Sequence, residues 1–130
     1  MRKDIKRYDL NESITLDKLK ENNFRKGGFI KDTSPVKYFY DRYLVDGILL
    51  HIEIGINKDG TFNFDDYNNI YVLNDKLRKP YYPFYSDNQY SEILDLIIIK
   101  YNQIMDDLTK KDILQEKVIN NNKILQNKRG

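Results

Sequence analysis

Apolar residues alternate with other residues between positions 38 and 64, and two Asp-Gly pairs interrupt the alternation. Successive side chains of a strand point to opposite faces, so this pattern predicts an antiparallel sheet with one apolar face. The apolar face of its middle strand contains Ile48, Leu50, Ile52, Ile54 and Ile56. The opposite face of that strand is wetter and contains Leu49, His51, Glu53 and Gly55.

The second Asp-Gly pair, within Asn57–Thr61, is typical of a type I turn followed by a bulge in which Gly60 has positive φ. This geometry pairs the two ends of the turn and places Phe62 opposite Ile56, so that Phe64 also joins the apolar face. A tight two-residue loop would shift the register by one residue and expose the whole set.

The first Asp-Gly pair allows two registers. With the same bulge, three pairs face one another: Leu44 with Ile48, Tyr40 with Ile52, and Tyr38 with Ile54. With a two-residue turn, the odd-numbered residues 39–45 take these places, which points Asp41 toward the core. We favour the bulge because burying a carboxylate is costly.

Helical spacing begins after Thr15, whose side chain is typical of an N-cap. The spacing predicts a short helix that ends near Asn22-Asn23. We expect Phe24 to fold back onto the core, before Gly27-Gly28 ends the pattern.

A longer helix is predicted from Ser91, as its N-cap, to Leu108. Its apolar residues form two neighbouring stripes: Ile93, Leu96, Ile97, Ile104 and Leu108 in one, and Leu94, Ile98, Tyr101 and Met105 in the other. A helix on a single sheet needs only one apolar face. The extra width predicts a second cover, supplied by the first helix, by the segment after Lys110, or by a second copy of the chain.

Five further segments complete the predicted fold. Phe29-Ile30 begins a short edge strand, and Thr33–Pro35 forms a turn, since the residue before a proline is pushed away from helix. Ile70–Leu73 is a fourth strand. Thr109–Asp112 is a turn, followed by a second helix that frays because asparagines interrupt its apolar residues.

Together these segments predict an α+β fold: an antiparallel meander sheet of four to five strands, with a short N-terminal helix and a long C-terminal helix packed on one face. The 130 residues suffice for a single domain. Within it we expect a basic N-terminal arm at 1–12, the α+β core at 13–109, and a basic, partly helical extension at 110–130.

The composition excludes several kinds of functional site and of cellular location. The chain has 11 tyrosines and no cysteine, which excludes disulfides, thiolate zinc sites and cysteine nucleophiles, and fits a reducing compartment. Residues 1–7 lack the apolar core of a signal peptide, and no apolar run is long enough to span a membrane. We therefore expect a cytoplasmic protein without membrane contact.

Charge is distributed unevenly along the chain. The net charge is +2, with +3 in residues 1–7 and +4 in residues 110–130, which leaves −5 for residues 8–109. Basic ends can contact nucleic acid or an acidic partner, although ends this short more often serve solubility.

His51 is the only histidine, and Glu53 shares its predicted strand face. Together with Asp65 or Asp66 the two could bind a metal, but no recognisable ligand spacing supports this, and an ordinary polar sheet face explains them better. Turn chemistry explains Asp65-Asp66 better than a nuclease-like carboxylate pair, because Asp side chains bond the local backbone.

No other group completes a catalytic arrangement. Gly27-Gly28 lacks the frame of a phosphate loop, and none of the serines has a paired base. The sequence therefore predicts no catalytic residue, no cofactor and no metal site, and thus no enzyme.

The best candidate for binding is an aromatic segment preceded by two cations: Arg78, Lys79, Tyr81, Tyr82, Phe84 and Tyr85. Cations beside aromatic planes occur where proteins stack bases and at the hot spots of protein interfaces. The alternative is that the rings close the core between the sheet and the long helix. We expect Tyr82 and Phe84 inside, and Tyr81 and Tyr85 partly exposed.

The order of three stretches along the chain, and their composition, resemble those of other proteins. The stretches are Ile14–Phe24, the tyrosine-rich meander, and Ser91–Leu108 followed by Asp112-Ile113-Leu114. Over about residues 13–115 they resemble a loose class of small uncharacterised proteins from phages and mobile elements of low-GC bacteria, without a diagnostic motif. The resemblance implies an accessory protein that binds host or rival machinery, for instance as an inhibitor of a defence system.

These observations predict a non-catalytic binding protein whose target is another protein, with homodimerisation through Ser91–Leu108 as a further option. The alternative is a nucleic-acid-binding protein that uses the basic ends and the segment Arg78–Tyr85.

Overall fold

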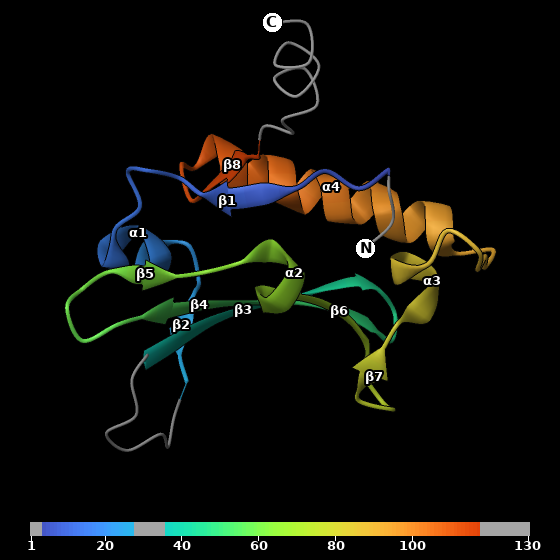
Figure 1. Cartoon of the computed structure of the whole chain (residues 1–130). Helices are drawn as coiled ribbons and strands as arrows, with labels where there is room; N and C mark the ends of the chain where they lie inside the picture. The colour runs from blue at the N-terminus through green and yellow to red at the C-terminus, as the bar shows by residue number, and fades with distance from the viewer. Residues whose placement is uncertain (1–3, 28–35, 118–130) are drawn as a thin grey trace, which may run out of the picture.

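The computed structural model describes residues 4–27 and 36–117. It contains both strands and helices, as predicted (Figure 1). Its strands are β1 (Tyr8–Leu10), β2 (Arg25–Lys26), β3 (Val36–Val45), β4 (Ile48–Ile56), β5 (Phe62–Asn63), β6 (Ile70–Asn74), β7 (Lys79–Pro80) and β8 (Leu114–Glu116). Its helices are α1 (Leu16–Glu21), α2 (Asp66–Asn69), α3 (Tyr82–Tyr85) and α4 (Leu94–Lys110). The α+β fold class is confirmed, with an antiparallel sheet, a short N-terminal helix and a long C-terminal helix.

β4 is the central strand of the main sheet, whose order is β2-β3-β4-β6-β7. β5 and β6 share one edge of β4: β5 pairs with Gly55 and Ile56, and β6 pairs with the stretch from Ile48 to Ile52. The fourth predicted strand therefore pairs with β4 and not with β5, which departs from simple meander order. α2 lies between β5 and β6 and carries the chain along this edge.

The second Asp-Gly turn has the predicted geometry. The Asn57 N–H donates to the carbonyl oxygen of Thr61 over 2.8 Å, and Gly60 has φ of +85°. Ile56 pairs with Phe62, as the bulged turn predicts. This turn chemistry sets the register of the hairpin.

The first hairpin combines features of the two predicted registers. Tyr38 and Tyr40 pair with isoleucines of β4, as the favoured register predicts. The expected pairing of Leu44 with Ile48 is wrong, because Val45 pairs with Ile48 and the extra residue of the bulge lies within β3. The bulge still leaves Leu44 buried.

One face of the sheet is covered and forms the core. α4 and the antiparallel pair β1–β8 lie over this face (Figure 1). Its fully buried side chains include Leu50, Ile52 and Ile54 of β4, and Ile97, Tyr101, Met105 and Leu108 of α4. Phe24 is also buried and stacks on Tyr40 with ring centroids 4.9 Å apart, which confirms that the chain folds back after α1.

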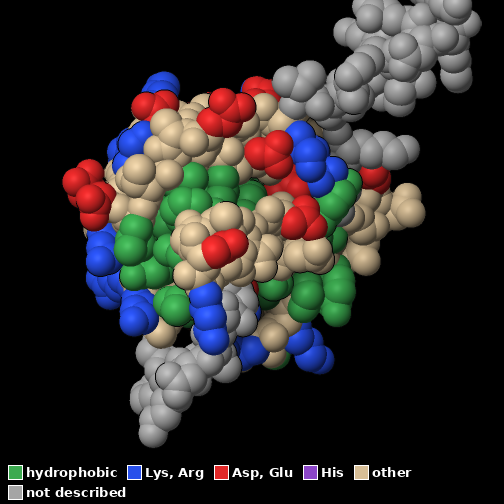
Figure 2. Space-filling view, turned by 60° about the vertical axis from the view of Figure 1, so that its left-hand side comes forward, with side chains coloured by type: hydrophobic (Ala, Val, Ile, Leu, Met, Phe, Trp, Pro, Cys, Tyr) green, Lys and Arg blue, Asp and Glu red, His purple; other side chains and the backbone are tan. Residues whose placement is uncertain are grey.

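The core is less completely covered at one end of the molecule. Hydrophobic side chains reach the surface at the end where α1 and β5 lie, flanked by lysines and arginines (Figure 2). α1, β4 and β5 carry partly buried apolar residues there, among them Leu16, Ile56 and Phe62.

The two longer helices begin differently. Thr15 caps α1 as predicted, because its hydroxyl oxygen accepts the Lys18 N–H over 3.2 Å. The predicted N-cap of α4, Ser91, is wrong: α4 begins at Leu94, and the Ser91 hydroxyl hydrogen-bonds the hydroxyl of Tyr81. A side chain engaged with a neighbouring element does not satisfy the free N–H groups of a helix end.

The chain after α4 forms a strand where a helix was expected. The turn at 109–112 is confirmed, with Asp112 at φ +58°, but Leu114–Glu116 form β8. β8 pairs with β1, and Tyr8 and Ile113 are buried at this contact with the core. Burial of apolar area outweighs the weak local preference for helix.

β2 is a short edge strand that the sequence did not predict. Arg25 and Lys26 pair with Phe39 and Tyr38 of β3. The edge strand predicted at 29–30 and the turn predicted at 33–35 lie outside the described residues, as does the chain after 117.

Candidate functional site

The face of the sheet opposite α4 has no helix of the described residues over it (Figure 1). Strand pairing places eight side chains on this face, and we call the set the outer sheet face: Phe39, Asp41 and Tyr43 of β3, Leu49, His51 and Glu53 of β4, and Tyr71 and Leu73 of β6. His51 lies at its centre, because it pairs with Asp41 on one side and with Tyr71 on the other.

Two carboxylates hold the His51 ring from opposite sides. Nδ1 of the ring lies 2.5 Å from Oδ1 of Asp41, and Nε2 lies 3.1 Å from Oε1 of Glu53. The Lys37 ammonium lies 3.7 Å from the second oxygen of Glu53. A neutral imidazole donates one hydrogen, so only the imidazolium form donates to both carboxylates at once.

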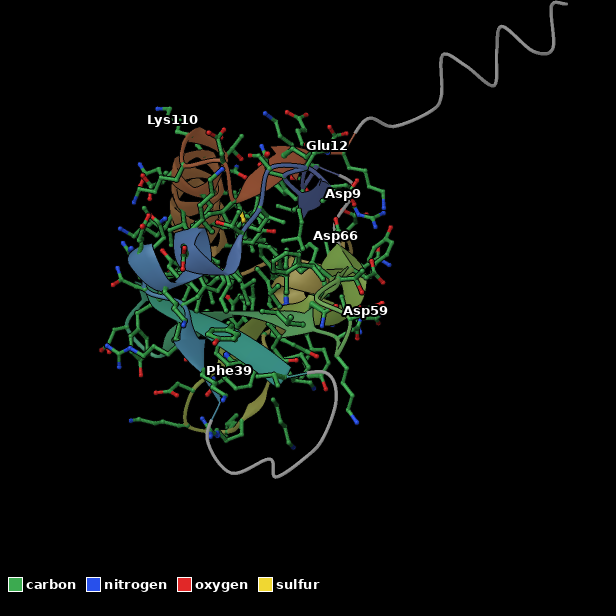
Figure 3. The ribbon with its side chains drawn as sticks, turned by 90° about the vertical axis from the view of Figure 1, so that its left-hand side faces the viewer. Asp9, Glu12, Phe39, Asp59, Asp66 and Lys110 are labelled. Atoms are coloured by element: carbon green, nitrogen blue, oxygen red, sulfur yellow. The ribbon has the colours of Figure 1, made fainter. Side chains whose placement is uncertain are left out.

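Aromatic rings flank His51 on both neighbouring strands. The centroid of its ring lies 5.1 Å from that of Phe39 and 5.7 Å from that of Tyr71. Figure 3 shows Phe39 on the side of β3 that faces away from α4. Gly27 lies against it, and a Cβ at this position would force the Phe39 ring to shift.

The outer sheet face is hollowed beside His51, with a volume of about 410 Å³. The hollow is lined by Asp41, Leu49, His51, Glu53, Tyr71, Leu73 and Arg78. Burial, and then the charge of Glu53, raises the pKa of Tyr71. The hydrogen bond of the Tyr43 hydroxyl to Asp75, at 2.6 Å, raises the pKa of Tyr43. Both phenols therefore stay protonated at neutral pH.

The predicted binding segment, residues 78–85, does not form one surface. Arg78 and Lys79 are both exposed. Arg78, with φ of +55°, lines the hollow, whereas Lys79 belongs to β7 and does not line it. Tyr82 is 55% exposed, so its expected inside position is wrong. The segment forms the one-turn helix α3, which turns Tyr82 about 200° away from Phe84, whereas an extended chain would place both on one side.

The remaining rings of the segment pack into the structure. Phe84 is fully buried, with its centroid 4.9 Å from that of Tyr101, which confirms its predicted inside position. Tyr81 and Tyr85 are partly buried, as predicted. The Tyr85 hydroxyl accepts the Val72 N–H over 2.8 Å, so these rings connect β6 to α4.

The two neighbouring aspartates have separate roles. Asp65 caps α2, and its side chain accepts the Tyr67 N–H over 3.2 Å, as turn chemistry predicts. Asp66 is 1% exposed and accepts two hydrogen bonds from Arg7, at 2.7 and 2.5 Å. Within residues 4–27 and 36–117, no three His, Cys, Asp or Glu side chains gather as a metal site.

The sequence did not identify Asp41, Phe39 or Tyr71 as site residues. A signal for Asp41 existed, because the favoured register of the first hairpin places it opposite His51. Tyr71 joins the site only through the pairing of β6 with β4, which no local pattern specifies. The same is true of the contact between Arg7 and Asp66, which lie 59 residues apart.

Two further findings concern membrane spans and similarity to known proteins. Among the described helices, none combines the length and the apolar character needed to cross a membrane. Comparison of the chain with models of protein families, with curated proteins and with solved structures gives no match.

Proposed function

We propose that this protein is a non-catalytic accessory binding protein that contacts a protein partner through the outer sheet face. The observation that carries the proposal is a sheet face with leucines, aromatic rings and charges, over which no described helix lies. Interface cores are enriched in aromatic residues and arginine, and the hollow beside His51 gives a partner side chain a place to insert.

The exposed carboxylate in the lining of the hollow favours a basic side chain of the partner. Arg78 also lines the hollow, but its guanidinium lies 3.9 Å from a carboxylate oxygen of Asp75. Asp41 keeps 52% of its side chain exposed, and Glu53 lies on the other side of His51. The ring of Tyr71 suits a cation, and Leu49 and Leu73 suit its aliphatic stem. The net negative charge of residues 8–109 also favours a basic partner.

The contacts of His51 support a binding role over a catalytic one. Both ring nitrogens face carboxylates, so neither is paired with a hydroxyl that it could activate. The resemblance to phage and mobile-element proteins suggests that the partner belongs to host or defence machinery, which the protein would modulate or inhibit.

A nucleic-acid partner is the second candidate, and one observation favours it. The rings of Phe39, His51 and Tyr71 lie in a row across three strands, an arrangement that proteins use to stack bases. Asp41 and Glu53 lie among these rings and would repel phosphate groups, which is why a protein partner comes first.

Affinity capture from a lysate of a low-GC bacterium, analysed by mass spectrometry, tests the proposal with two matched variants. Asp41→Lys reverses a charge on the outer sheet face, and Tyr82→Ser removes a side chain of similar exposure from α3. We expect the wild type and Tyr82→Ser to capture the same protein. Asp41→Lys should capture it with an affinity lower by about tenfold or more, because it places a cation against the basic partner group.

The opposite pattern, in which Tyr82→Ser loses the protein and Asp41→Lys keeps it, would move the binding surface to residues 78–85. Gel shifts at low salt, with single- and double-stranded probes, separate the second candidate. Probe binding that weakens steeply with salt would replace the protein partner by nucleic acid.

A further inference from the structure

α4 keeps an apolar stripe at the surface although its other apolar residues are buried. Ile93, Leu96 and Ile99 are 41%, 58% and 54% exposed. They recur at every third position, from Ile93 at the N-cap onward, so they form a row that slants across the surface of the helix. The described residues thus cover most of the two predicted apolar stripes, including Ile97 and Tyr101, and leave only Ile93 and Leu96 of them exposed. Ile99, which belongs to neither predicted stripe, joins these two at the surface.

We infer that the stripe is the centre of a homodimer in which α4 packs antiparallel against α4 of a second copy of the chain. A twofold axis at Leu96 places this residue against its own counterpart. The same axis places Ile93 opposite the partner's Ile99, and Ile99 opposite the partner's Ile93. Both copies then contribute the same three apolar residues to the contact, as a self-complementary interface requires.

The charges beside the stripe point to a second copy as the occupant. The axis at Leu96 also places Glu92 opposite the partner's Lys100, and the symmetry repeats this pair. Neither side chain has an ion-pair partner within residues 4–27 and 36–117. A parallel arrangement would instead place each of these charges against its own kind, which is unfavourable.

The size of the stripe sets the strength of the dimer. Three apolar side chains per copy are a small contact beside the roughly 800 Å² that each partner buries in a standard interface. We therefore expect weak association, with a dissociation constant in the micromolar range or above. The outer sheet face lies on the other side of the sheet from α4 (Figure 1), so the dimer leaves it accessible.

Sedimentation equilibrium of the full chain over a range of concentrations tests the inference. Leu96→Glu places two carboxylates at the axis, and Leu77→Glu is its control, since Leu77 is 65% exposed in the turn between β6 and β7. We expect the wild type and Leu77→Glu to dimerise equally. Leu96→Glu should stay monomeric over the same range, with an unchanged circular dichroism spectrum because the position is exposed.

Charge exchange tests the antiparallel geometry separately. Glu92→Lys and Lys100→Glu should each dimerise more weakly than the wild type, because each variant pairs like charges with itself. An equimolar mixture of the two should associate again, because both cross-pairs then join opposite charges.

A wild type that stays monomeric throughout, or a Leu96→Glu variant that dimerises like the wild type, would overturn the inference. A mixture that associates no better than the single variants would overturn the antiparallel arrangement.

Discussion

Two clusters of charged side chains show what burial does to similar chemistry. Arg7, directly before β1, binds Asp66 of α2, whereas Asp41 and Glu53 hold His51 on the outer sheet face. Each cluster contains a carboxylate oxygen 2.5 Å from a nitrogen. Asp66 is 1% exposed, but the Asp41 side chain is 52% exposed. A similar bond is therefore structural in one place and open to a partner in the other.

The buried cluster satisfies Asp66 almost completely. Besides the two bonds from Arg7, its carboxylate accepts the Tyr8 N–H over 2.9 Å, and the guanidinium lies 3.4 Å from the centroid of the Tyr67 ring. Figure 3 shows Asp66 where β1 and α2 come together. Burial opposes ionisation of Asp66, but the hydrogen bonds and the charge of Arg7 outweigh it and lower the pKa of the carboxyl.

The largest effect should come from breaking the buried pair. Arg7→Met leaves the Asp66 carboxylate buried without its main donor, and we expect a loss of about 3 kcal/mol in the free energy of unfolding. Arg78→Met is the matched control, because Arg78 is exposed and its ion pair with Asp75 is 3.9 Å long. Urea denaturation measures both, and equal losses would contradict the distinction between the two clusters.

The pH dependence of stability should separate the clusters next. Because folding lowers the pKa of Asp66, its contribution is fully present above the ordinary carboxyl pKa of about 4 and is lost as the pH falls through the folded value. We expect the wild type to exceed Asp66→Asn in stability at neutral pH, and the gap to narrow in acid. A gap that stays constant down to pH 2 would show that Asp66 acts through packing and not through its charge.

A smaller effect of opposite sign is expected at a buried group without a partner. The Tyr101 hydroxyl is buried, and no hydrogen-bond partner for it lies among the described residues; burial raises its pKa. Tyr101→Phe should therefore stabilise the fold by about 1 kcal/mol. Its control, Tyr85→Phe, should destabilise by a similar amount, because it leaves the Val72 N–H unpaired. Thermal unfolding measures the stability of both variants, and a loss of stability in both would contradict the prediction.

The smallest effect on stability is expected on the outer sheet face. Asp41→Asn should change the free energy of unfolding by less than about 0.5 kcal/mol, because the side chain is largely exposed. A loss comparable to that of Arg7→Met would mean that this cluster holds the sheet together. In that case the contacts of Asp41 would be structural, and the proposal that the outer sheet face binds a partner would lose its support.

The sequence predicted those parts of the fold that depend on neighbouring residues. The alternation in β4, the turn at Asn57–Thr61, the cap at Thr15 and the inside position of Phe84 all follow from rules that act within a few positions. The misplaced side chain of Tyr82 has the same origin, because a single helical turn was taken for an extended segment.

What only the tertiary structure decided are the contacts between distant segments. By itself the sequence determined that β4 has one apolar and one mixed face, but not that β6 would bring Tyr71 beside His51 or that α4 would leave Leu96 open. It also gave no sign that β8 would pair with β1. Such pairings depend on how much apolar area the whole chain can bury, and no single stretch of sequence specifies that total.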